Sequence, residues 1–322
     1  MNTVICTLFE NHYHYGVAAL TNSLYYHGFR GHIFAGFRGS LPDWGSNSQT
    51  NLSLKWPDAR TKMVADGLQL HLLPVTTTYH LTNYKPDFML ELWNGLAPDA
   101  DAMVYLDPDI VLTTSWSLIE NWLKCGVALC EDVNSPIPEN HPKRVAWREY
   151  YAKVGITLNF KDTMYVNGGF AGVSLKDRVF LENWKIAQDH MAAAIGGLDR
   201  SAFAGKKLSP IDQSAFSPFG RTDQDALNVA IGMSDVDVSL VGQEIMAFKD
   251  GEAMLPHALG QPKPWQANPL MQMLHGKIPR LVEKEYWKYC NIKIKIYSDR
   301  FVKIRNIQIK IAAFVARFYV RR

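Results

Sequence analysis

The sequence has few cysteines and no long hydrophobic run. Its 322 residues include four cysteines without a Cys-x-x-Cys pair, which argues against a zinc knuckle or a disulfide framework and fits a reducing compartment. No stretch approaches the roughly 20 apolar residues that a membrane-spanning helix needs. Residues 1–6 lack both a basic segment and a long apolar segment, so they predict a first strand and not a signal peptide. We therefore expect a cytoplasmic protein.

The composition shows no collagenous, disordered or disulfide-rich bias, since 47% of the residues are hydrophobic and 20% are charged. The net charge of +3 conceals an asymmetry: residues 291–322 hold nine Lys or Arg residues against one Asp, a local charge of +8, which leaves −5 for the preceding residues. Basic character therefore belongs to the C-terminal segment and not to the body, and we expect no nucleic-acid partner.

Strand-like and helix-like segments alternate along the chain. The strand-like segments are 4–8, 32–37, 68–73, 102–106, 126–130, 163–175 and 236–241. The helix-like segments are 16–26, 86–96, 143–153, 177–194 and 222–231, and segments 39–62 and 196–221 have the composition of loops. This alternation predicts an α/β fold with a Rossmann-like mixed, mostly parallel sheet and helices on both faces. We expect one domain over 1–285 and a C-terminal appendage over 286–322.

Two carboxylates, Asp107 and Asp109, directly follow the apolar segment 102–106. At the carboxyl end of a sheet strand, both can turn toward the crevice where open α/β sheets bind ligands. Carboxylate oxygens suit a hard divalent cation, which in turn neutralises a diphosphate. Many Asp-Pro-Asp stretches are simple turns, so this motif by itself leaves both interpretations open.

Three further segments place polar residues in unusual positions. Asn167 and two glycines, at 168 and 169, interrupt an apolar segment, which indicates either a bulge or close approach by a ligand. The segment 222–228 opens a helix with acidic and amide side chains, which also suits N-capping. The segment 257–265 contains a histidine that could complete a metal site and a lysine that could meet a phosphate, although a lone histidine is more often structural.

The order of these four segments resembles glycosyltransferase family 8, which includes glycogenin and bacterial lipopolysaccharide glucosyl- and galactosyltransferases. The family shows Asp-x-Asp after a strand, then Asn-x-Gly, then Asp-Gln-Asp-x-Leu-Asn, then His-x-x-Gly-x-x-Lys-Pro-Trp. Here these motifs are Asp107 with Asp109, Asn167 with Gly169, segment 223–228 and segment 257–265. The resemblance spans residues 1–265, about four fifths of the chain.

The resemblance implies a GT-A fold, a UDP-sugar donor, Mn²⁺ or Mg²⁺, and retention of anomeric configuration. It implies that the metal ligands are Asp107, Asp109 and His257. It further implies that Lys263 and the backbone near Gly260 contact the phosphates. The donor sugar would be bound by Asp223 and by Asn167 with Gly169 of the same motif. Gln224 would lie beneath the anomeric carbon. The departing phosphate oxygen would then act as the base, while Asp225 is the nearest carboxylate for a double displacement.

Two parts of the pattern depart from the family. The stretch that usually cradles uracil is represented here by Glu10 and Tyr13, a looser match. The usual arginine before the Asp-x-Asp strand is replaced by Lys85, which can neutralise a phosphate or carboxylate but lacks the bidentate fork of arginine. His275 is a rival to His257 as third metal ligand, although the motif spacing favours His257.

The C-terminal segment has the pattern of a basic amphipathic helix. Apolar residues recur at helical spacing from Tyr297 to Phe318, with basic residues between them that include Arg321 and Arg322. This pattern is typical of a helix at an anionic membrane surface, and the resemblance agrees with it. We therefore expect peripheral association with the cytoplasmic face of the membrane. The alternatives are a helix that packs on its own core and one that packs on a second subunit in an oligomer.

With what the resemblance implies, these features predict a metal-dependent, retaining hexosyltransferase that uses a UDP-sugar. The expected acceptor is a glycan, with or without a lipid anchor, of a bacterial polysaccharide or lipopolysaccharide. Alternatives are an inverting transferase or nucleotide-sugar hydrolase on the same fold, and a catalytically silent nucleotide-sugar-binding protein. The loop-like segment 196–221 is a candidate to close over donor or acceptor.

Overall fold

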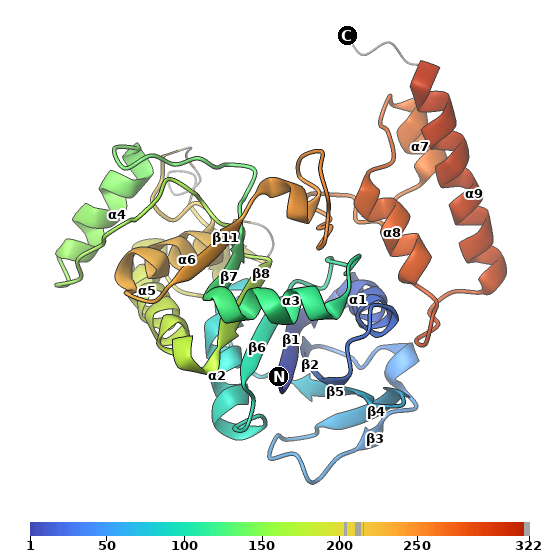
Figure 1. Cartoon of the computed structure of the whole chain (residues 1–322), viewed down its shortest axis with the longest axis horizontal. Coiled ribbons are helices and arrows are strands. Elements are labelled where there is room, and N and C mark those ends of the chain that lie inside the picture. Colours follow the sequence, from blue (N-terminus) through green and yellow to red (C-terminus); the bar gives the residue numbers. More distant parts are fainter. Residues whose placement is uncertain (203–204, 210–213, 215, 319–322) are drawn as a thin grey trace.

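A computed structural model describes residues 1–202, 205–209, 214 and 216–318. Within these residues, nine strands form one sheet in the order β11-β7-β8-β6-β1-β2-β5-β4-β3 (Figure 1). Their bounds are Thr3–Glu10 (β1), Gly31–Arg38 (β2), Gln49–Thr50 (β3), Arg60–Ala65 (β4), Leu68–Pro74 (β5), Ala102–Leu106 (β6), Val127–Cys130 (β7), Phe170–Ser174 (β8) and Val238–Val241 (β11). Two further short strands, Arg200–Ser201 (β9) and Lys206–Lys207 (β10), pair with each other.

Most strands of the large sheet run in one direction. β1 pairs in parallel with both β2 and β6, β2 pairs in parallel with β5, and β11 pairs in parallel with β7. β8 runs antiparallel between β6 and β7, so its first residue, Phe170, lies beside Leu106 at the end of β6. The expectation of a mixed, mostly parallel α/β sheet is confirmed. This register places the start of β8 where the functional residues after β6 begin.

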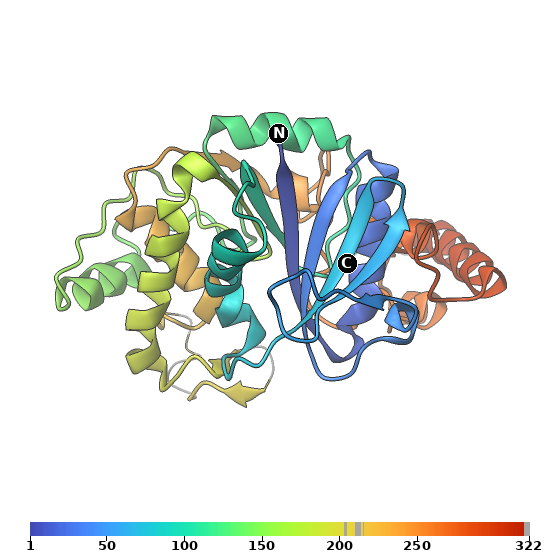
Figure 2. The same cartoon turned by 90° about the horizontal axis from the view of Figure 1, so that it is seen from below.

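Helices cover both faces of the sheet (Figures 1 and 2). Alternate residues of β1 separate the two cores: Val4, Cys6 and Leu8 pack into one, and Ile5 and Phe9 pack into the other. The first core includes residues of α2 (Lys85–Gly95), α4 (Pro142–Ala152), α5 (Val179–Ile195) and α6 (Thr222–Met233). The second core includes residues of α1 (His14–Tyr26) and α3 (Trp116–Trp122).

The C-terminal helices α7 (Pro269–Leu274), α8 (Leu281–Tyr289) and α9 (Asp299–Val315) gather at one end of the molecule, beside α1 (Figure 1). The boundary expected between residues 285 and 286 falls inside α8. Asn22 of α1 connects this region to the body of the protein. Its side-chain amide donates to the carbonyl oxygens of Tyr289 and Ile294 at 2.9 and 2.8 Å, respectively. Its side-chain oxygen accepts from the Ile294 N–H at 2.8 Å. The appendage is therefore anchored by a buried polar contact as well as by apolar packing.

The two faces of α9 have different environments. Ile309 and Ala312 are buried and pack inward. The predicted stripe is divided. Its first residues pack on the protein, because the rings of Tyr297 and Phe301 lie 5.0 and 5.8 Å from the ring of buried Trp287. The later residues are 43–72% exposed: Ile304, Ile307, Ile311, Phe314 and Phe318. This exposed part of the stripe is therefore not the face that packs on the protein's own core. Arg321 and Arg322 lie outside the described residues, and no helix among the described ones is long and apolar enough to cross a membrane.

Two segments expected to be loops contain strands. Segment 39–62 includes β3 and the start of β4, which extend the sheet: β4 pairs antiparallel with β5, and β3 pairs antiparallel with β4. β4 is half-exposed along its length, so it lacks the apolar alternation that makes a strand visible in the sequence. Segment 196–221 includes the short strands β9 and β10, and its residues 203–204, 210–213 and 215 lie outside the described part of the chain.

Candidate functional site

The candidate site lies at the carboxyl ends of β1 and β6. From β1 the sheet continues to β2 on one side and to β6 on the other, which makes this the switch point where open α/β sheets bind ligands. Asp107 directly follows β6, and Glu10 ends β1. The start of β8 and the N-termini of α2 and α6 reach the same place through the contacts described below.

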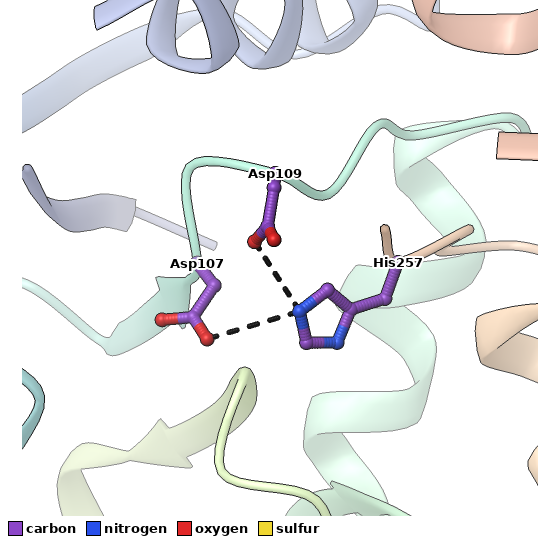
Figure 3. A group of neighbouring side chains, drawn as sticks. All are labelled: Asp107, Asp109 and His257. Carbon is purple, nitrogen blue, oxygen red and sulfur yellow. Dashed lines mark ion pairs between the residues drawn. The ribbon is translucent and has the colours of Figure 1, made fainter. Parts of the chain in front are cut away.

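Asp107, Asp109 and His257 form one cluster (Figure 3). His257 Nε2 lies 3.2 Å from Asp109 Oδ1 and 3.9 Å from Asp107 Oδ2. Ligands on adjacent vertices of an octahedron with bonds of about 2.1 Å are separated by roughly 3 Å, so these atoms can share one divalent ion with little movement. Carboxylate oxygens with one imidazole nitrogen suit Mn²⁺ and Mg²⁺. The residues present therefore fit the metal that the sequence predicts.

Backbone pairing brings His257 to the aspartates from 148 positions away in the chain. Ile110 and His257 form an antiparallel bridge, and the Ala258 N–H donates to the Asp109 carbonyl oxygen at 3.0 Å. The His257 N–H donates to the carbonyl oxygen of Met246 at 3.1 Å. His275, the rival ligand, is exposed, and its Nδ1 lies 2.7 Å from the carbonyl oxygen of Met271 in its own helix.

Lys263 compensates the charge of Asp109. Its ammonium lies 2.5 Å from Asp109 Oδ2 and donates to the Ala258 carbonyl oxygen at 2.7 Å. Burial alone would raise the pKa of Asp109, but His257 and Lys263 outweigh it and hold this pKa well below its usual range. Lys263 therefore contacts the same carboxylate that a metal would use.

Lys85 joins the metal cluster to α6. Lys85 is 1% exposed, and its ammonium lies 3.1 Å from Asp107 Oδ1 and 2.9 Å from Asp223 Oδ2. It also donates to the carbonyl oxygen of Gly168 at 2.8 Å. Burial lowers the pKa of Lys85, but the two carboxylates more than offset this and raise the pKa above its ordinary value. Lys85 thus holds three segments together from the first turn of α2.

The N-terminal turn of α6 presents unsatisfied polar atoms. Gln224 accepts from the Gly168 N–H at 3.0 Å through Oε1. Its Nε2 is buried without a hydrogen-bond partner among the described residues, and so are Asp223 Oδ1 and His257 Nδ1. A buried polar group without a partner costs free energy, and such groups gather where a ligand completes the bonding. These atoms therefore indicate a polar ligand beside the Asp107–Asp109–His257 cluster.

Asp225, two positions further along α6, has a different environment. It is fully buried, and its carboxylate lies 2.8 Å from the Lys143 ammonium. It also accepts from the Tyr165 hydroxyl at 2.7 Å and from the Arg221 N–H at 2.8 Å. Burial raises its pKa, although Lys143 and Tyr165 oppose this effect. A carboxylate enclosed in this way is suited to fixing the start of α6 and not to attacking a sugar.

Asn167 is oriented by a residue that the sequence pattern did not single out. Its Nδ2 donates to Asp132 Oδ2 at 2.7 Å, and its Oδ1 accepts from the Gly169 N–H at 2.9 Å. Asp132 is buried and lies just after β7. Asn228 also gains a role, because its amide pairs with both the N–H and the carbonyl oxygen of Val166 at 2.9 Å. Asp132 belongs to none of the four motifs, whereas Asn228 ends the Asp-Gln-Asp-x-Leu-Asn motif, whose spacing does not predict this contact.

The remaining candidates lie around the β1 end of the site. Glu10 pairs with Arg38 at 3.5 Å, and both side chains are about one third exposed. The Tyr13 ring lies 5.6 Å from the Lys263 ammonium and 5.7 Å from the Trp265 ring. Gly260 has φ +73°, a conformation that favours glycine, and an added Cβ there would meet no atom within 4 Å. Tyr13 and the Gly260–Lys263 loop therefore lie on the same side of the metal cluster.

We expect Gly169→Ala to weaken metal binding. An added Cβ would lie 2.6 Å from His257 Cε1 and 2.9 Å from Asn167 Oδ1, so the imidazole would have to move. Displacing a metal ligand typically costs about 10- to 100-fold in metal affinity. Manganese titration by calorimetry measures the effect. Gly95→Ala, at a position with no atom within 4 Å of the added Cβ, is the matched control, and equal manganese affinities in the two variants would contradict the prediction.

Comparison with known proteins gives limited information. No protein-family model matches the chain, and no curated protein matches it. Among solved structures, the chain is similar to the glycosyltransferase GlyE of Streptococcus pneumoniae TIGR4, with 13% sequence identity and a TM-score of 0.47. The match covers 96% of this chain and 64% of that one, so this chain spans less than two thirds of the length of GlyE. At this identity and score, the assignment of function rests on the site itself.

Proposed function

We propose that the protein is a metal-dependent glycosyltransferase that takes a hexose from a UDP-sugar. One observation carries the proposal: the Asp107–Asp109–His257 cluster adjoins a helix N-terminus where Asp223 Oδ1 and Gln224 Nε2 are buried without partners among the described residues. A metal cluster suits a diphosphate, and unsatisfied acceptor and donor atoms suit sugar hydroxyls. The resemblance to glycosyltransferase family 8 supports the same donor and a retaining outcome.

In this proposal Asp107, Asp109 and His257 would hold Mn²⁺ or Mg²⁺, which supplies charge stabilisation for the departing diphosphate. Lys263 would leave Asp109 and donate to a phosphate oxygen, and Tyr13 and Glu10 would border the uracil. Asp223 Oδ1 would accept a hydrogen bond from a sugar hydroxyl while Lys85 keeps the other carboxylate oxygen in place. Asn167, fixed by Asp132, would line the sugar subsite beside Gly169. Catalysis then consists of positioning and electrostatic stabilisation.

Gln224 is the proposed neighbour of the anomeric carbon. Its Oε1 is held by the Gly168 N–H, so its Nε2 is directed by a fixed amide plane. An amide is a poor nucleophile, which favours a same-face route in which the departing phosphate oxygen accepts the proton of the acceptor hydroxyl. Asp225 has no part in this route because its carboxylate is already bound by Lys143 and Tyr165.

A donor panel tests the proposal. UDP-glucose, UDP-galactose and their N-acetylhexosamine counterparts are incubated with the full chain and Mn²⁺, and released UDP is measured without an acceptor. Slow release from one donor, abolished by chelation, supports the proposal. Inversion at the anomeric carbon, followed by NMR, would favour the inverting alternative. Binding of no donor in the presence of metal would contradict the proposal.

We further propose that the exposed stripe of α9 lies on an anionic membrane surface, which would bring a lipid-linked glycan acceptor to the site. The stripe carries Ile304, Ile307 and Ile311, and the exposed basic residues Lys303 and Lys310 flank it on the same helix. Apolar burial plus attraction to acidic headgroups is the combination that interfacial helices use.

Replacing both Ile307 and Ile311 by Asp should abolish this association. The change removes apolar area and adds negative charge to the stripe, so we expect at least a tenfold drop in sedimentation with phosphatidylglycerol vesicles. Leu52→Asp, at a site that is 93% exposed in the body of the protein, is the control and should sediment like wild type. Equal sedimentation of the stripe variant and wild type would exclude the stripe as the contact surface.

A further inference from the structure

A pocket lies at the opposite end of the sheet from the metal cluster. Its volume is about 310 Å³, and it is lined by residues at the beginnings of β1, β2 and β5 and by the chain after α2. β1 has eight residues, so its two ends are roughly 23 Å apart at about 3.3 Å per residue. The pocket is therefore separate from the site described above.

The polar lining of this pocket is neutral apart from one carboxylate. It contains the imidazoles of His32 and His71 and the amides of Asn51 and Gln69, with Asp99 at the rim. No Lys or Arg lines the pocket in the described part of the chain, which argues against a phosphate or nucleotide ligand. Burial, with a smaller contribution from His32, lowers the pKa of His71 to about 4, so His71 is uncharged near neutral pH.

A hydrogen-bonded chain of side chains ends in the pocket. The Asn51 amide donates to Thr61 Oγ1 at 2.8 Å, Thr61 Oγ1 lies 2.8 Å from His71 Nδ1, and His71 Nε2 lies 2.9 Å from His32 Nδ1. His32 ends the chain and is exposed, so its ring can meet water or a ligand in the pocket. The two tautomers of the His71–His32 pair make His32 Nε2 either a donor or an acceptor.

A hydroxyl group matches both states of His32 Nε2, because a hydroxyl donates and accepts. The apolar part of the lining offers a small surface for the C–H face of a sugar ring, in which Leu54 is half-buried and Val4 and Phe34 are buried. The volume lies at the lower end of the roughly 300–1,000 Å³ typical of ligand pockets, which suits one or two sugar rings. A pocket that combines polar groups without positive charge and an apolar surface suits a neutral carbohydrate.

We propose that this pocket binds an uncharged sugar unit of the acceptor glycan, away from the transfer site. The claim that the sugar belongs to the acceptor rests on the proposed function. The claim that the pocket binds a neutral sugar does not depend on it. A glycan held at both places is tethered to the enzyme, which raises its effective concentration at the transfer site.

Binding is measured on the full chain without metal or donor, by saturation-transfer NMR and calorimetry with glucose, galactose, N-acetylglucosamine and their disaccharides. We expect at least one sugar to bind to the wild-type protein. His32→Phe keeps an aromatic ring but loses Nε2, and we expect it to weaken the binding of that sugar at least tenfold. Gln69→Leu, half-exposed in β5, is the second pocket variant and should also weaken binding. His275→Phe is the matched control outside the pocket, and thermal unfolding verifies that each variant is folded.

Asp107→Asn separates this inference from the proposed function. Sugar binding that survives Asp107→Asn and is lost in His32→Phe and Gln69→Leu supports the pocket, even if no UDP-sugar is turned over. Binding that is lost in Asp107→Asn but kept in the two pocket variants places the sugar in the transfer site and overturns the inference. Absence of binding by every sugar at its solubility limit, or a preference for inorganic phosphate over all of them, overturns it as well.

Discussion

Replacing Asp109 by Asn should lower metal-dependent UDP release by at least about a thousandfold. The amide keeps the shape of the side chain but loses the charge that His257 and Lys263 contact at 3.2 and 2.5 Å. With one of two carboxylates gone, the cluster should bind Mn²⁺ weakly, and the leaving diphosphate would lose its main stabilisation. UDP release and manganese titration measure the two effects.

Lys263→Met provides the matched comparison for Asp109→Asn. It breaks the same buried ion pair, so any general loss of stability should be similar, but it leaves both carboxylates and His257 in place. We expect Lys263→Met to bind Mn²⁺ at least as tightly as wild type, because its ammonium no longer competes for Asp109. Asp235→Asn, at an exposed position, controls for the loss of a surface charge. Full turnover in Asp109→Asn, or loss of manganese binding in Lys263→Met alone, would refute this assignment.

Replacing Lys143 by Met should lower the free energy of unfolding by about 3–5 kcal/mol. Asp225 is fully buried and would lose the ammonium that lies 2.8 Å away. Adding Asp225→Asn to Lys143→Met should restore part of the stability, because the uncompensated charge disappears. Denaturant unfolding measures the stability of the wild type, Lys143→Met and the double variant. Lys185→Met is the control: its partly exposed ammonium pairs with Asp189 at the surface and with the largely buried Asp87, so we expect a loss of about 1 kcal/mol. Equal losses in the Lys143 and Lys185 variants would contradict the prediction.

The same residues distinguish the two routes of sugar transfer. If Asp225 only fixes the start of α6, then Asp225→Asn combined with Lys143→Met should keep measurable UDP release at a temperature where it is folded. A complete loss of release in this folded double variant, with manganese binding intact, would revive Asp225 as a nucleophile. Rescue of release by azide in that variant would identify the double displacement directly.

Particular elements explain why the main part of the fold was predictable. The strand Ala102–Leu106 was predicted to the residue, because it is buried on both faces and consists of apolar residues bounded by polar ones. Helices α1, α2 and α5 were located within two residues at each end. β4 was missed because half-exposed edge strands lack an apolar pattern, and their pairing with β5 depends on a partner strand.

The site was predictable in part. Asp107, Asp109 and His257 were proposed together from motif order, and the structure brings them within ion-pairing distance. Lys143 and Asp132 were not found, because a buried partner of a known residue has no signal of its own in a single sequence. The role of Asp225 was also hidden, since successive helix positions lie about 100° apart and only packing decides which one faces the ligand.

The sequence by itself determined the strand and helix alternation, the carboxylates after β6 and the apolar stripe at the C-terminus. These features are local: they depend on residue type and spacing within a single element. The tertiary structure decided which histidine meets the aspartates, which carboxylate of α6 has an oxygen without a partner among the described residues, and which face of α9 remains exposed. These features depend on contacts between segments far apart in the chain, such as Asn22 with Ile294 and Lys85 with Asp223. Local spacing does not encode such contacts, because they arise only when burial and charge pairing are satisfied across the whole fold at once.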